Sequence, residues 1–141
     1  MRFINKEKFD FYWENGYLVV EKIFSTGEAD LFYESAKKVA TNDFKTLLHL
    51  DREEDLKRQN PESKDGDRDT IVNLTKWIQF HPRMVGILEE LYEREVACLQ
   101  SIILFKEKNS SYQSTSWNPH QDNSYPRNKN NLYISVGYAL S

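Results

Sequence analysis

The central stretch of this sequence is Trp117-Asn118-Pro119-His120-Gln121-Asp122-Asn123-Ser124-Tyr125-Pro126. Strand-like runs flank it, at residues 96–105 before it and 132–140 after it. Both runs are rich in the β-branched and aromatic residues that favour strands. We therefore expect the stretch to lie between two strands of a sheet.

His120 and Asp122 carry the chemistry that this stretch suggests. Residues i and i+2 of a strand point to the same face, so the imidazole and the carboxylate are expected to meet at one point. They are two of the three ligands of a 2-His-1-carboxylate triad, which holds non-haem Fe(II). A second histidine should come from farther along the chain, and the sequence ends at Ser141 before supplying one. The spacing alone also fits a surface turn with a polar histidine.

Length and composition limit the class of protein. The chain has 141 residues, of which 39% are hydrophobic and 29% charged, and a net charge of −3. This balance suits one globular domain or less and gives no basic footprint for nucleic acid. The single cysteine, Cys98, is expected to be a buried thiol in a reducing compartment. The sequence shows neither a signal peptide nor a membrane span, so we expect a cytoplasmic protein.

Residues 1–95 are expected to be mostly helical, with one early strand at Tyr17–Glu21. Ser25 and Glu28 have the spacing of a capping box, which opens a helix, and Pro82 suits the first turn of another. Helices are expected at Lys6–Asn15, from Ser25 to about Ala40, and from Pro82 to about Glu95. Their expected buried residues are Leu31, Phe32, Ser35, Ala36 and Val39 in the second helix, and Val85, Leu88, Leu91 and Tyr92 in the third.

Two segments of this part allow more than one interpretation. Residues 51–69 are dense in charges of both signs, which predicts a loop or a frayed helix, or alternatively a lid over a site. Residues 70–80 are apolar and fit either a helix or a strand. His49 is expected to be structural and His81 to mark a helix boundary, neither binding metal.

Gln100 is the unusual residue of the run 96–105. In a strand it shares a face with Cys98, Ile102 and Leu104, and an inward glutamine must find hydrogen bonds. Either a loop backbone satisfies it, or it lines a pocket. Lys106 is in phase with it and either stays in solvent or reaches an anion.

Several stretches together resemble the phytanoyl-CoA dioxygenase (PhyH) family of Fe(II)- and 2-oxoglutarate-dependent oxygenases. Residues 11–25 are similar to the opening of the family's domain, and 132–141 to one of its later strands. Residues 100–106, the polar loop after them and His120-Gln121-Asp122 resemble its strand, variable loop and metal-binding segment. The family has Trp directly before this motif, whereas here Asn118-Pro119 separates Trp117 from it. The resemblance covers essentially the whole chain and about the first half of the family's domain.

The resemblance implies a fold, an activity and a domain organisation. The fold would be α+β and mostly β, a partial double-stranded β-helix (jelly roll) with N-terminal helices packed outside and barrel strands at about 96–141. The activity would be hydroxylation of a small-molecule substrate with O2, Fe(II) and 2-oxoglutarate. Residues 1–141 would be the N-terminal portion of a single oxygenase domain.

The resemblance also assigns roles to residues. His120 and Asp122 would bind the metal, and a carboxylate at 122 favours hydroxylation over halogenation. Tyr138, Gln100 and Lys106 would bind the co-substrate, and the residues near the substrate would be Trp117, Gln121 and Tyr125. The family's second metal-binding histidine and its 2-oxoglutarate-binding arginine would follow Ser141, so we expect a truncated chain that is inactive alone. The alternatives are a non-catalytic jelly-roll binding module and a degenerate fragment.

Overall fold

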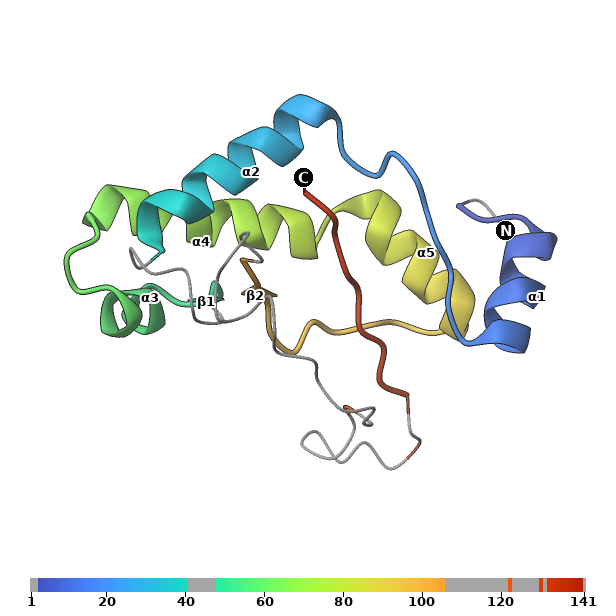
Figure 1. Ribbon diagram of the computed structural model, residues 1–141. Helices are drawn as coiled ribbons and strands as arrows, with labels where there is room; N and C mark the ends of the chain where they lie inside the picture. Colours follow the sequence, from blue (N-terminus) through green and yellow to red (C-terminus); the bar gives the residue numbers. More distant parts are fainter. Residues whose placement is uncertain (1–2, 41–47, 106–121, 123–129, 131, 141) are drawn as a thin grey trace.

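The computed structural model describes residues 3–40, 48–105, 122, 130 and 132–140. In this part of the chain, helices dominate (Figure 1). The helices are α1 (Lys6–Asn15), α2 (Thr26–Val39), α3 (Glu53–Gln59), α4 (Asp65–Gln79) and α5 (Pro82–Tyr92). The strands β1 (Leu48–His49) and β2 (Ile102–Ile103) pair antiparallel, with Leu48 opposite Ile103 and His49 opposite Ile102.

Local capping explains why the expected helices form where they do. The Asn5 side chain accepts a hydrogen bond from the Lys8 N–H at 2.9 Å and begins α1. Gly16 ends α1 in the left-handed region, at φ 79°, where glycine carries no steric penalty. The capping box of Ser25 and Glu28 is present at the start of α2, and its Ser25 backbone N–H lowers the pKa of Glu28. The predicted helix starts and the end of α1 are thus confirmed.

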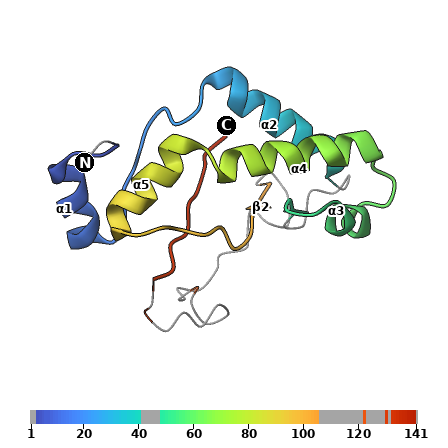
Figure 2. The ribbon, with the colours of Figure 1, turned by 180° about the vertical axis from the view of Figure 1, so that it is seen from behind.

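The main core lies between α2 and α4, which run alongside each other in both views (Figures 1 and 2). Ala36, Val39 and Ile71 are fully buried there. A second apolar cluster joins the N-terminal segment to α5, where the Tyr12 and Tyr92 hydroxyls lie 2.9 Å apart. The main cluster comprises Phe32, Ala36, Val39, Ala40, Leu50, Leu56, Ile71, Val72, Ile78, Ile103 and Phe105.

Two of the predicted buried faces need partial correction. On α2, Phe32, Ser35, Ala36 and Val39 are buried as expected, but Leu31 is 55% exposed. On α5 the buried residues are Met84, Gly86, Ile87 and Leu91, so of the four predicted only Leu91 is fully buried. The buried face of α5 is rotated from the predicted one because Ile87 and Leu91 pack on the N-terminal segment, beside Ile4.

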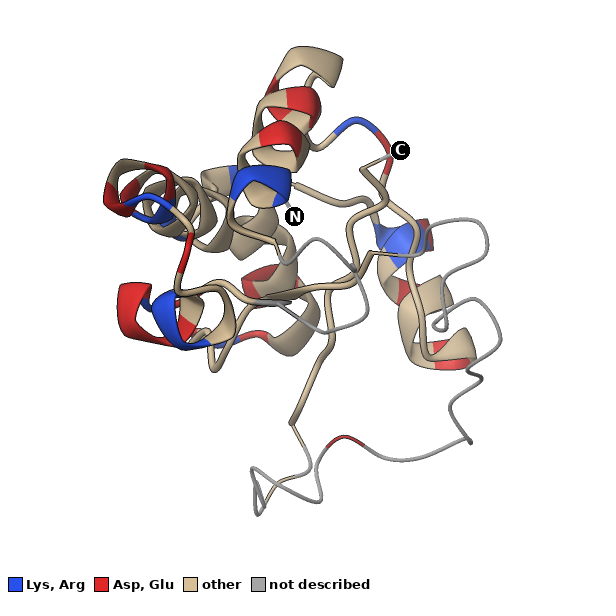
Figure 3. Ribbon diagram, turned by 60° about the vertical axis from the view of Figure 1, so that its left-hand side comes forward, with Lys and Arg blue, Asp and Glu red and all other residues tan. Residues whose placement is uncertain are grey.

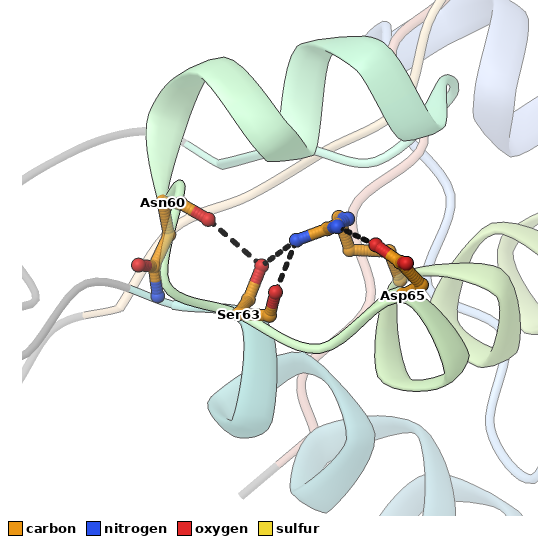
Figure 4. Close-up of polar contacts among 4 residues, drawn as sticks. Asn60, Ser63 and Asp65 are labelled. Atoms are coloured by element: carbon orange, nitrogen blue, oxygen red, sulfur yellow. Dashed lines mark hydrogen bonds and ion pairs between the residues drawn. The ribbon is translucent and has the colours of Figure 1, made fainter.

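The interpretation of residues 51–69 as a solvated loop or frayed helix is wrong. They contain α3 and the first turn of α4, and Leu56 of α3 is fully buried in the main core. Arg68 is 2% exposed and donates to the Ser63 Oγ at 2.8 Å and to its carbonyl, and it pairs with Asp65 (Figure 4). Ser63 in turn donates to the Asn60 carbonyl at 2.8 Å. The charged residues of this segment therefore stabilise the turn between α3 and α4.

Residues 70–80, for which a helix and a strand were both possible, form a helix, since α4 extends to Gln79.

The mostly β jelly roll is also wrong for the described residues. Within them the sheet consists of β1 and β2 alone, and neither Tyr17–Glu21 nor residues 132–140 form a strand. Residues 132–140 instead run as one long trace across the helices, and Tyr138 and Leu140 pack against the main core (Figure 1). Alternation of apolar and polar residues shows that one face of an extended segment can lie on an apolar surface. A β-strand also needs a neighbouring strand that pairs with its backbone N–H and C=O groups, and the alternation does not show whether one is present.

Charged residues of both signs share the surface of the helices (Figure 3). On α3, for example, Glu53, Glu54 and Asp55 in the first turn are followed by Lys57 and Arg58 in the last. This order places acidic groups at the positive end of the helix dipole and basic groups at the negative end, which stabilises a short helix. Across the described residues, no helix has the length and apolarity needed to cross a membrane.

Two glycines predict opposite effects of the same substitution. A Cβ at Gly86 of α5 would overlap the Phe3 ring. The backbone N–H groups of Phe3 and Ile4 both donate to the Glu90 carboxylate at 3.0 Å and hold this backbone against α5, so the ring itself must leave its place in the second apolar cluster. We expect Gly86→Ala to lower the free energy of unfolding by about 1–3 kcal/mol. A Cβ at Gly66 of α4 would meet no other atom, so Gly66→Ala should raise the free energy of unfolding by about 0.4–1 kcal/mol, because alanine lowers the conformational entropy of the unfolded chain. Urea unfolding of the two variants checks this, and equal effects would contradict the packing.

Candidate functional site

Asp122 is the one residue of the central pair that the structure describes. Its side chain is exposed, and its Oδ2 accepts a hydrogen bond from the Ser135 hydroxyl at 2.6 Å. A donation to a carboxylate at this distance is charge-assisted and fixes the orientation of the acceptor. The contact joins the central stretch to residues 132–140, thirteen positions later.

Tyr138 lies on the same C-terminal segment and is half-buried. Its ring centroid is 5.3 Å from that of Phe24, at the start of the chain's second helical region. Burial, and secondly the neighbouring Cys98, raise the pKa of Tyr138 to about 12. The phenol therefore keeps its proton at neutral pH and is available as a hydrogen-bond donor.

Gln100 does not point inward as expected. It is exposed, as are Cys98 and Ile102 of the same predicted face, whereas Ile103 and Phe105 are buried. A shift of one residue moves every side chain of an extended segment to the other face, which explains the inversion. Gln100 thus has access to a ligand in solvent rather than to a buried loop.

Cys98 is an exposed free thiol, so its predicted burial is wrong. Its sulfur lies 3.7 Å from the Gln100 carbonyl oxygen. Partial desolvation, and to a smaller degree the charge of Asp51, raise the pKa of the thiol, while a Ser101 hydrogen bond opposes this. A raised pKa reduces the fraction of the thiol that is ionised to thiolate.

A polar cluster that the sequence interpretation missed lies beside Cys98. It consists of Asp51, Gln79 and Ser101, and we call it the Asp51 network. Gln79 Nε2 donates to Asp51 Oδ1 at 2.9 Å and to Ser101 Oγ at 2.6 Å, and the Ser101 N–H donates to Asp51 Oδ1 at 2.7 Å. The only sequence signal was Gln79, a polar residue beside the buried Ile78 at the end of an apolar helix.

The other two histidines occupy different settings. His49 belongs to β1, its side chain is exposed, and it lines a hollow of about 370 Å³ with Asp55, Arg58 and Gln59. His81 is the N-cap residue of α5, which confirms its boundary position. Its ring packs edge-on against those of Phe24 and Trp77, with centroids 5.1 and 5.4 Å away.

A comparison with family models decides the family. The model for phytanoyl-CoA dioxygenase (PhyH) matches residues 12–141. The chain belongs to the PhyH family. The match includes the central stretch and both flanking runs, so the predicted resemblance is confirmed for most of the chain. No curated protein and no solved structure matches it.

Membership of the PhyH family suggests a metal site at the central stretch, and the described residues allow part of this prediction to be examined. In the described part of the chain, no group of three or more His, Cys, Asp and Glu side chains is placed to hold a metal. Asp122 does fit the requirement for a ligand, because it is an exposed carboxylate that a neighbouring hydroxyl orients. Five of the predicted site residues lie outside the described residues, namely His120, Lys106, Trp117, Gln121 and Tyr125.

Among the predicted co-substrate residues of this PhyH chain, the structure describes two. The segment that contains Gln100 continues into Ile103 and Phe105, which belong to the main core cluster on which Tyr138 packs. Residues 96–101 and 132–140 therefore form the described part of the candidate site.

Proposed function

We propose that this protein is an Fe(II)- and 2-oxoglutarate-dependent oxygenase that hydroxylates a small molecule. The observation that carries the proposal is the PhyH match over residues 12–141, which includes His120 and Asp122 at the spacing of two metal ligands. The hydrogen bond from Ser135 to Asp122 supports it, because ligating carboxylates are commonly oriented by such partners.

His120 and Asp122 would hold the iron, and both suit it chemically. A neutral imidazole and a carboxylate are ligand types of non-haem Fe(II) centres. When bound, the iron and 2-oxoglutarate supply the oxygen chemistry that hydroxylation requires, and the protein supplies binding and orientation. A carboxylate at position 122 supports hydroxylation rather than halogenation.

The remaining assignments divide the site between co-substrate and substrate. Tyr138 would donate a hydrogen bond to a 2-oxoglutarate oxygen, and its raised pKa keeps the proton in place across the neutral range. Gln100 and Lys106 would bind the co-substrate as well, Lys106 through its charge. Trp117, Gln121 and Tyr125 would face the substrate near the mouth of the site.

Metal removal tests this function in the full-length protein. We expect a chelator to abolish the conversion of 2-oxoglutarate to succinate, and added Fe(II) to restore it. Zn²⁺ should occupy the same ligands without restoring turnover, because it has no redox chemistry. Mass spectrometry of succinate measures the result. Succinate formation that survives chelation, or that Zn²⁺ restores, would exclude an iron oxygenase. No succinate formation under any of these conditions would favour a non-catalytic binding protein.

A further inference from the structure

The Asp51 network joins three segments that are far apart in the sequence. Asp51 follows β1, Gln79 is the last residue of α4, and Ser101 precedes β2. An amide nitrogen carries two hydrogens, so Gln79 can donate to Asp51 and to the Ser101 hydroxyl at once. All three residues are partly buried, where hydrogen bonds between protein groups are less exposed to competition from water.

This network holds Ser101, the last residue of the segment 98–101, through side-chain hydrogen bonds that the short sheet does not supply. β1 and β2 have two residues each, and the pairing is extended by one bond from the Leu50 N–H to the Ser101 carbonyl at 3.0 Å. A two-stranded ladder of this length is marginal in water. Gln79 adds an anchor on α4, which is part of the main core.

The fixed segment leads directly into Ile103 and Phe105, which belong to the main core cluster on which Tyr138 packs. Asp51 is close enough to Cys98 for its charge to raise the pKa of the thiol, and Ser101 hydrogen-bonds the same sulfur. Cys98 in turn is close enough to Tyr138 to raise the pKa of the phenol. A continuous series of neighbours therefore connects Asp51 through Ser101 and Cys98 to Tyr138.

We propose that Asp51 and Gln79 are positioning residues that hold residues 98–101 beside Tyr138 and thereby set the affinity of the site for its dicarboxylate co-substrate. The inference rests on the proposed function, in which Gln100 and Tyr138 bind 2-oxoglutarate. Neither Asp51 nor Gln79 touches the co-substrate. They act by keeping Gln100 and Tyr138 at a fixed separation, so their loss affects binding more than the later chemical step.

Gln79→Leu in the full-length protein tests this role, since it removes both donations and keeps a side chain of similar size. We expect the KM for 2-oxoglutarate to rise about fivefold to tenfold, the size of effect that losing one or two partly buried hydrogen bonds produces. The kcat should change by less than about twofold. Asn73→Leu is the matched control, because Asn73 is an exposed amide residue on the same helix.

Cys98 supplies a second measurement that does not depend on activity. It is the one cysteine of the chain, so its reaction with a disulfide reagent reports on residues 98–101. We expect the reaction at a fixed, mildly alkaline pH to be several-fold faster in Gln79→Leu and in Asp51→Asn. Asp51→Asn removes the negative charge that raises the pKa of the thiol, and Gln79→Leu removes the side-chain hydrogen bond that holds Ser101 and so loosens the segment around the sulfur. Asn73→Leu should react at the wild-type rate.

The two measurements separate the possible failures. An unchanged thiol rate in Gln79→Leu would overturn the positioning role. A faster thiol with an unchanged KM for 2-oxoglutarate would overturn the link to the co-substrate. Absence of 2-oxoglutarate turnover in the wild type would refute the proposed function and that link, while the thiol rate still decides the positioning role. If circular dichroism shows that Gln79→Leu does not fold, Asp51→Asn takes its place in the thiol measurement. Ser101→Ala, which removes the hydroxyl that accepts from Gln79, takes its place in the KM measurement.

Discussion

Substituting His120 by Ala in the full-length protein should reduce 2-oxoglutarate-dependent succinate formation by more than about a hundredfold, because changes to the outer partners of metal ligands already cost ten- to a hundredfold. Asp122→Ala should have the same effect. The double variant should be no worse than either single one, since ligands that act as a unit have non-additive effects. Succinate released per minute under saturating Fe(II) is the measurement.

Controls for this result come from the described residues. His49→Ala removes an exposed histidine to which the proposed function gives no role, and it should leave turnover unchanged. Ser135→Ala removes the hydroxyl that donates to Asp122 at 2.6 Å and should cause an intermediate loss, about tenfold. A His120→Ala variant with more than about a tenth of wild-type turnover would exclude His120 as a ligand.

Leu56→Ala should produce the largest loss of stability among single changes in α3. Leu56 is fully buried in the main core, and its truncation leaves a cavity that costs about 2–5 kcal/mol. For a chain of this size the melting temperature should fall on the order of ten degrees. Differential scanning calorimetry measures the change.

Lys57→Ala is the matched control for Leu56→Ala. It lies one residue away on the same helix, it is exposed, and its loss should change the free energy of unfolding by less than about 0.5 kcal/mol. Equal and small effects of the two substitutions would mean that residues 53–59 are solvated, as their charge density alone suggested. The contrast therefore tests the correction to that part of the chain directly.

The helix starts and the end of α1 were predictable because their signals are local, whereas α5 ends at Tyr92 and not at about Glu95 as expected. Asn5 and Ser25 cap helices through bonds to residues three positions away, and Gly16 ends α1 by its own backbone conformation. Pro82 at the first position of α5 belongs to the same class of signal. Each of these features depends on fewer than five neighbouring residues, so the sequence contains all of the information.

The sheet and the 51–69 segment were not predictable in the same way. Strand pairing depends on partners far along the chain, and an alternating pattern does not say whether the partner is a strand or a helical surface. Around Leu56 and Arg68, the surrounding charges concealed one buried apolar residue and one buried guanidinium. Such burial depends on α4 and the core packing against the segment, which no local pattern shows.

In the candidate site, too, local features were predictable and long-range contacts were not. Its residue types, His120 and Asp122, were readable from their spacing, and the family followed from several stretches in order. The hydrogen bond from Ser135 to Asp122 and the Asp51 network could not be predicted from the sequence, because each joins residues at least thirteen positions apart. The inverted face of residues 98–105 has a similar origin, since register is set by whichever surface the segment packs on.

The most direct test of a metal centre at the central stretch is an anaerobic calorimetric titration of Fe(II) into the full-length protein. We expect a single Fe(II) to bind the wild type, and its affinity to fall at least about a hundredfold in His120→Ala and in Asp122→Ala. The His49→Ala variant should bind as the wild type does. Unchanged Fe(II) affinity in either His120→Ala or Asp122→Ala would contradict the assignment of that residue as a ligand, and with it the proposed oxygenase site.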